Sequence, residues 1–63
     1  MKRQELLKHI RSHNCVLLRE GRRYSWWHNP KLNKRSAIPR NSEISNILVM
    51  KICKDLGIPP AKM

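Results

Sequence analysis

The chain has 63 residues and a formal net charge of +10, from fourteen Lys and Arg against four Asp and Glu. A chain of this length buries only about 60% of the surface that it exposes when unfolded, which allows one small core and excludes a second domain. A membrane-spanning helix needs roughly 20 successive apolar residues, and the sequence has no such run. We therefore interpret residues 1–63 as one domain without a signal peptide, not bound to a membrane and located in the cytoplasm.

The excess of positive charge indicates a polyanionic partner. Clustered Lys and Arg speed the encounter with phosphate backbones and gain affinity by releasing their counterions. We expect nucleic acid as the partner, and the alternative is a solvated basic surface that serves solubility or meets an acidic protein. A membrane-surface helix is less favoured, because it sets its cations opposite a broad apolar face rich in Leu, Phe and Trp, and the sequence has no Phe.

The cysteines and histidines do not indicate a metal site. Cys15 and Cys53 lie far apart in a chain without a secretion signal, so we expect two small buried side chains rather than a disulfide. His9 and His13 are four residues apart, with Cys15 just beyond, but no HExxH or CxxC motif accompanies them. A zinc site normally needs three or four ligands of fixed geometry, so we expect no metal and no cofactor.

Hydrophobic spacing predicts helices and strands in the order α-β-β-β-α. In chain order these are a helix over residues 2–13, strands over 15–20, 23–28 and 35–38, and a second helix that ends before Gly57. Asn14 is the expected stop of the first helix, and Gly21 marks a tight hairpin. Asn41 or Ser42 is the expected cap of the second helix, and Gly57 its left-handed end.

This order predicts an α+β fold with two layers. Sequential strands with short connections favour a three-stranded antiparallel sheet, and two amphipathic helices can then cover one face of it. The second helix should face the core with one stripe of apolar residues. That stripe consists of Leu48, Val49, Ile52, Cys53 and Leu56. Double-stranded RNA-binding domains have the same chain order, so the expected fold is of that kind.

The second strand carries the candidate binding residues. Strand alternation places Tyr24, Trp26 and His28 on one face, with Ser25 and Trp27 on the other. An aromatic row on the open face can stack bases while nearby cations hold phosphates. The expected cations are Arg22, Arg23, Lys34, Arg35 and Arg40. The alternative is that Trp26 only shields the sheet or docks a protein.

Three apolar residues fall off the core stripe of the second helix. Helical geometry would turn Ile44, Ile47 and Met50 toward solvent or another molecule, and exposed apolar clusters often mark interfaces. We expect them to dock a partner protein. The alternative is a wider apolar face that packs against the first helix or the tail.

Several short motifs, in this order and spacing, resemble the HicA family of small toxins. They are Leu-Leu-Arg-Glu-Gly at 17–21, Ser-Trp-Trp at 25–27, Asn-Pro at 29–30, Arg-Ser-Ala-Ile-Pro-Arg at 35–40 and Lys-Ile-Cys-Lys-Asp-Leu-Gly-Ile at 51–58. The resemblance covers nearly the whole chain, although no single motif is specific. It implies a fold similar to double-stranded RNA-binding domains, metal-independent cleavage of messenger RNA, and a HicB-type antitoxin partner that masks the active face.

Tyr24 stands where the HicA resemblance implies a catalytic histidine. Metal-free RNA cleavage needs a proton-transfer group with a pKa near 7, whereas tyrosines in general titrate near 10. His28 lies about 13 Å along the strand, at about 3.3 Å per residue, and is too distant to replace the missing histidine. We expect a toxin endoribonuclease that is weakened or inactive, because Tyr24 replaces the histidine. Tyr24 is either a natural variant or a deliberate change, and the expectation is the same in both cases. A non-catalytic module that binds RNA or docks an antitoxin is the alternative.

Overall fold

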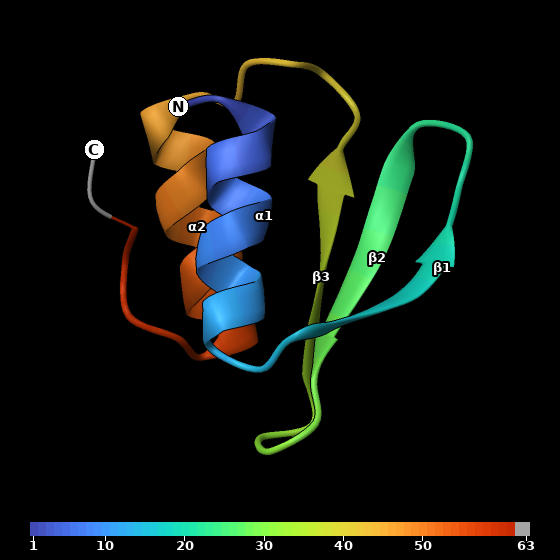
Figure 1. Cartoon of the computed structure of the whole chain (residues 1–63), viewed down its shortest axis with the longest axis vertical. Coiled ribbons are helices and arrows are strands. Elements are labelled where there is room, and N and C mark those ends of the chain that lie inside the picture. Colours follow the sequence, from blue (N-terminus) through green and yellow to red (C-terminus); the bar gives the residue numbers. More distant parts are fainter. Residues whose placement is uncertain (62–63) are drawn as a thin grey trace.

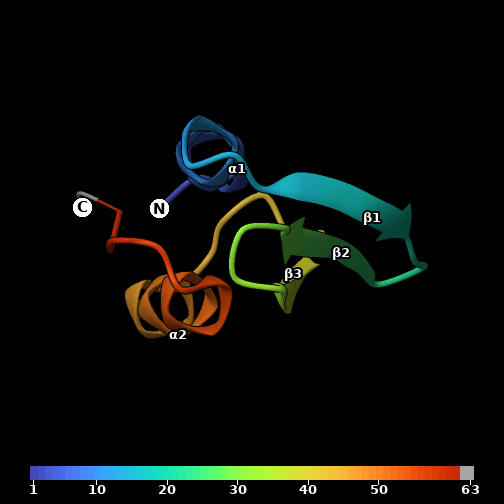
Figure 2. The same ribbon diagram turned by 90° about the horizontal axis from the view of Figure 1, so that it is seen from below.

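The computed structural model describes residues 1–61 and contains helices and strands in the predicted order. They are α1 (Arg3–Ser12), β1 (Val16–Glu20), β2 (Tyr24–Asn29), β3 (Lys34–Pro39) and α2 (Asn46–Leu56). The strands form one antiparallel sheet in the order β1-β2-β3. Both helices lie side by side in one layer, on one side of the sheet (Figures 1 and 2). The predicted α+β fold is therefore confirmed.

The core fills the space between the two helices and the inner face of the sheet. The buried apolar side chains of α1 are Leu6, Leu7 and Ile10, and those of α2 are Val49, Ile52, Cys53 and Leu56. Trp27 of β2 and Ile38 of β3 point into the same cluster. Burial of an aliphatic or aromatic side chain of this size contributes roughly 1.5–3 kcal/mol. The predicted stripe on α2 is confirmed, with Leu48 half-buried at its edge.

Left-handed residues end both helices, as the sequence predicts. Asn14 follows α1 with φ 67°, and Gly57 follows α2 with φ 69°. Gly21 has a different requirement, because its N–H donates to the carbonyl oxygen of Tyr24 at 2.7 Å. A Cβ atom at Gly21 would lie 2.8 Å from that same oxygen. The β1–β2 hairpin therefore needs glycine for close backbone approach.

The start of α2 differs from the prediction. Ser45, and not Asn41 or Ser42, caps the helix, and its Oγ accepts the N–H of Leu48 at 3.3 Å. The preceding segment is extended because it pairs with the N-terminal residues. The carbonyl oxygen of Ser42 accepts the N–H of Arg3 at 2.9 Å, and the N–H of Ile44 donates to the carbonyl of Met1 at 2.8 Å.

This pairing also corrects the prediction for Ile44. Its side chain is only 2% exposed, so it belongs to the core and does not present itself to a partner. The prediction assumed that Ile44 lies on the helix, where its angular position would be outward. In the extended segment before α2 the side chain turns inward instead.

The edge strand β1 does not follow a simple in-and-out alternation. Val16, Leu17 and Leu18 are all about half exposed, while the preceding Cys15 is buried. A β-bulge lies between Leu17 and Arg19, and β1 leads away from both helices (Figure 2). Because the helix layer does not extend over this strand, neither of its faces is fully covered.

Both cysteines are buried and unbonded, as the sequence predicts. Burial, and secondarily the nearby Cys53, raises the pKa of the Cys15 thiol. Within residues 1–61 no group of three or more His, Cys, Asp or Glu side chains is placed to hold a metal ion. In the same part of the chain, neither helix is long and apolar enough to cross a membrane.

Ser45→Ala tests the corrected cap of α2. Loss of the Oγ acceptor should lower the free energy of unfolding by about 1 kcal/mol, the usual value of an N-cap. Ser42→Ala is the matched control and should cost less, because the hydrogen bond of Ser42 uses its backbone carbonyl. Urea unfolding of both variants gives the comparison, and an equal or larger loss in Ser42→Ala would contradict the assignment of the cap.

Candidate nucleic-acid interface

The face of the sheet opposite the helices carries an aromatic row on β2. Tyr24 is 47% exposed and Trp26 is 37% exposed, whereas Trp27 is only 3% exposed and lies in the core. The half-buried His28 continues the row on the outer face. The predicted alternation is thus confirmed, with Trp26 as the exposed tryptophan.

Two arginines on the neighbouring strands flank this row. Trp26 lies opposite Arg19 of β1, and His28 lies opposite Arg35 of β3. Arg19, Trp26 and Arg35 line one shallow pocket together with Leu18. An indole face between two guanidinium groups can hold a base by stacking and its phosphates by charge.

Arg19 is absent from the residues that the sequence indicated. Regular alternation along β1 would place it on the helix side of the sheet, beside the inward positions of β2. The bulge between Leu17 and Arg19 shifts the register by one residue, which turns the side chain of Arg19 to the open face. Bulges of this kind leave little signal in a sequence.

The predicted cations occupy different places in the structure. Arg22 and Arg23 are exposed in the hairpin loop that leads into Tyr24. Arg35 is part of the open face, as described above. Lys34 begins β3 at the opposite end of the sheet, next to Gly57, so it lies away from the hairpin loop and Tyr24.

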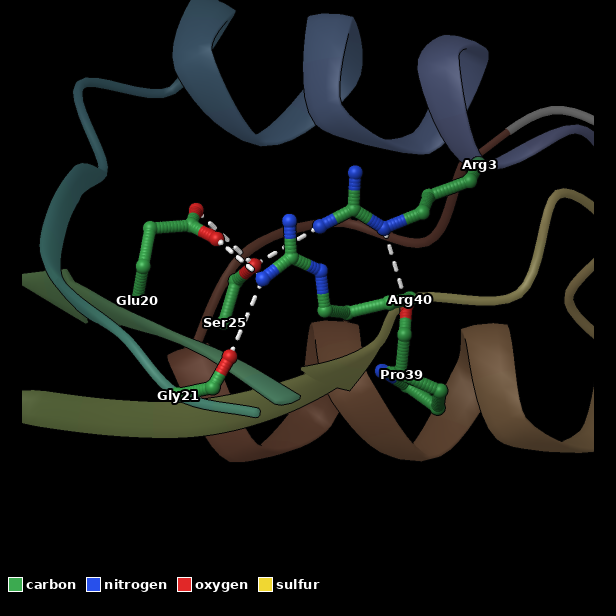
Figure 3. A network of polar contacts seen from close by, with 6 residues as sticks. All are labelled: Arg3, Glu20, Gly21, Ser25, Pro39 and Arg40. Carbon is green, nitrogen blue, oxygen red and sulfur yellow. Dashed lines mark hydrogen bonds and ion pairs between the residues drawn. The ribbon is translucent and has the colours of Figure 1, made fainter. Parts of the chain in front are cut away.

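Arg40 makes two contacts with the β1–β2 hairpin at the protein surface. Its guanidinium donates to the carbonyl oxygen of Gly21 at 3.0 Å and pairs with the carboxylate of Glu20 at 3.1 Å (Figure 3). Both contacts attach the end of β3 to the β1–β2 hairpin. These contacts support the loop that carries Arg22 and Arg23, and the contact of Arg40 with phosphate stays a prediction, since its side chain is 51% exposed.

A second arginine completes this network from the other layer. Arg3 of α1 donates to the carbonyl oxygen of Pro39 and to the Oγ of Ser25, each at 2.8 Å. Ser25 is fully buried and its hydroxyl donates to Glu20 at 3.0 Å. Figure 3 shows the hydroxyl of this serine between the carboxylate of Glu20 and the guanidinium group of Arg3. The start of Tyr24's strand is therefore fixed to α1, β1 and β3 at once.

His28 stands apart from Tyr24 on the same strand face. Its Nε2 lies 3.2 Å from the Oδ1 of Asn33 in the β2–β3 turn. His9 contacts the carbonyl oxygen of Pro59 at 2.8 Å, and its ring meets His13 edge-on with centroids 4.8 Å apart. The structure thus places no histidine beside Tyr24 within residues 1–61.

The remaining predicted docking residues lie on the exposed side of α2. Ile47 is 84% exposed and Met50 is 56% exposed. They are the two residues of the predicted docking set that the structure leaves accessible, since Ile44 is buried. A small exposed apolar cluster of this kind is compatible with a protein contact.

Comparisons with known proteins gave no match to the chain from protein-family models, curated proteins or solved structures.

Replacement of Arg3 tests whether the network supports the hairpin. Arg3→Met should lower the free energy of unfolding by about 1–3 kcal/mol, because it removes charged hydrogen bonds to the buried Ser25 and to Pro39. Lys8→Met on the exposed side of the same helix should change it by less than about 0.5 kcal/mol. Chemical denaturation measures both, and equal effects would show that the Arg3 contacts contribute nothing specific.

Proposed function

We propose that the chain is an RNA-binding domain of the HicA type, in which Tyr24 occupies the position of the catalytic histidine. The observation that carries the proposal is the open sheet face, where exposed Trp26 shares a pocket with Arg19 and Arg35 and exposed Tyr24 precedes it on the same face of β2. Stacking of a base on such an aromatic ring is worth about 1–3 kcal/mol. Neither helix occupies this face, so a ligand can approach it (Figure 2).

The charge distribution supports the same partner. Within residues 1–61 the three ion pairs engage Met1, Arg40 and Lys51. The open-face and hairpin arginines therefore keep their charge available to a ligand. They are Arg19, Arg22, Arg23 and Arg35. Together with the net charge of +10, this favours a phosphate backbone over an uncharged ligand.

The proposed activity of the family type is metal-independent cleavage of messenger RNA, as a toxin of a type II toxin–antitoxin system acting in the cytoplasm. A histidine at position 24 would take the proton of a 2′-hydroxyl or give one to the leaving oxygen. The phenol of Tyr24 can donate a hydrogen bond to a phosphate beside Arg22 and Arg23, but phenols in general are poor bases at neutral pH. The chain with Tyr24 therefore binds RNA and cleaves it weakly or not at all.

A second candidate function is docking of an antitoxin of the HicB type. The exposures of Ile47 and Met50 favour it, since an apolar pair on a basic domain suits a partner with an acidic rim around an apolar centre.

If this docking occurs, Ile47→Asp should weaken the complex with a co-produced HicB-type protein by tenfold or more, about 1.4 kcal/mol. Pull-down and titration of that complex measure the effect, and unchanged binding would remove the docking proposal.

RNA cleavage by Tyr24→His tests the proposed function. With divalent metal chelated by EDTA, the histidine variant should cleave a messenger RNA at least about 100-fold faster than the unchanged chain, because general acid–base catalysis typically contributes that much. Its rate should depend on pH around neutrality.

Tyr24→Phe is the control, and it should bind RNA without cleaving it. Cleavage by neither form, with RNA still bound, would favour a non-catalytic RNA-binding module. Absence of RNA binding in all three forms would overturn the proposed function.

A further inference from the structure

A groove joins the open sheet face to α2 across the edge strand β3. One wall is formed by Tyr24, Trp26 and Arg35, and the other by Leu48, Lys51 and Asp55 of α2. It encloses a volume of about 410 Å³, which lies within the range of small-ligand sites of roughly 300–1,000 Å³. A single nucleotide is of suitable size for this space, whereas a duplex would lie across its mouth.

Lys51 provides the positive charge of the helical wall. Its Nζ pairs with the carboxylate of Asp55 at 3.0 Å, one turn further along α2. The Lys51 side chain is 69% exposed, so the pair is solvated and easily exchanged for another anion. The carboxylate of Asp55 repels a phosphate that approaches Lys51 from the Asp55 side. The favourable position for a phosphate is therefore on the side of Lys51 that faces Arg35.

We propose that this groove is a subsite for one unpaired nucleotide, with its base on Trp26 and its phosphate between Arg35 and Lys51. The inference rests on the proposed RNA binding and adds α2 to the binding surface. The nucleotide should be unpaired, because a base inside a duplex is stacked between adjacent bases. Its flat face is then not available for stacking on a tryptophan. Single-stranded RNA is thus the preferred ligand, although the order of helices and strands is the one found in duplex-binding domains.

The test compares two lysines on the same helix. Lys51→Met and Lys54→Met remove the same charge, and both side chains are exposed, but only Lys51 lines the groove. For a fluorescent single-stranded RNA, Lys51→Met should raise Kd about three- to tenfold more than Lys54→Met, as expected for one lost phosphate contact. The slope of log affinity against log salt should also fall by about 0.7 in magnitude for Lys51→Met alone.

Coupling to Trp26 separates a shared nucleotide from a general charge effect. If Trp26 and Lys51 hold the same nucleotide, the double variant Trp26→Ala with Lys51→Met should lose less affinity than the product of the two single losses. Trp26→Ala combined with Lys54→Met should instead behave multiplicatively. Lys51→Arg keeps the charge and should retain the affinity within about twofold. Circular dichroism of each variant checks that it is folded.

The outcomes separate the two proposals. RNA binding by the unchanged chain, with equal losses in Lys51→Met and Lys54→Met, would overturn the subsite and leave the RNA-binding function standing. If a duplex of the same sequence bound more tightly than the single strand, the proposal that the bound nucleotide is unpaired would also be overturned. No binding of either RNA by the unchanged chain would overturn the function and the subsite together.

Discussion

The structure depends on one constraint, which is that a short chain must bury its sheet with only two helices. Both helices lie against the same face, because Trp27 and Ile38 need cover from α1 and α2 to form a closed core. Nothing in residues 1–61 covers the other face. The aromatic row of β2 is therefore exposed as a consequence of the way in which the core is made, and the exposed Trp26 follows from the buried Trp27 on the same strand.

The arginines divide into two groups according to this constraint. Arg3 and Arg40 converge on Ser25 and Glu20 and connect the helix layer with the hairpin (Figure 3). A buried hydroxyl needs partners for its hydrogen bonds, and Arg3 supplies one of them from a different layer. The arginines of the open face and of the hairpin loop make no such contacts within residues 1–61, so their charges remain directed to solvent and to a ligand.

Exposed apolar side chains also follow from the limited helix layer. The edge strand β1 extends beyond it, which leaves Val16, Leu17 and Leu18 half exposed. An apolar edge strand is a site of unwanted pairing in many sheets, and a bulge is one feature that opposes it. Here the bulge has a second effect, because it brings Arg19 to the open face beside Trp26. Protection of the edge and construction of the site thus come from the same irregularity.

Local patterns in the sequence determined the elements, their order and the inner and outer faces of β2. Alternation and helical periodicity act between near neighbours, and Asn14 and Gly57 end the helices through their own backbone preferences. The resemblance of the segment around Tyr24 to the HicA family is also a prediction from the sequence. The role of Tyr24 as an expected catalytic position is a proposal, because the fold alone does not test chemistry.

Only the tertiary structure decided the start of α2, the register of β1 and the partners of the cations. Ser45 caps the helix because the residues before it pair with the N-terminal segment, more than forty positions away in the chain. Arg40 contacts Glu20 and Lys51 approaches the open face for the same kind of reason, since packing joins elements that are separate in sequence. A pattern confined to one element contains no information on which distant group will satisfy a charge.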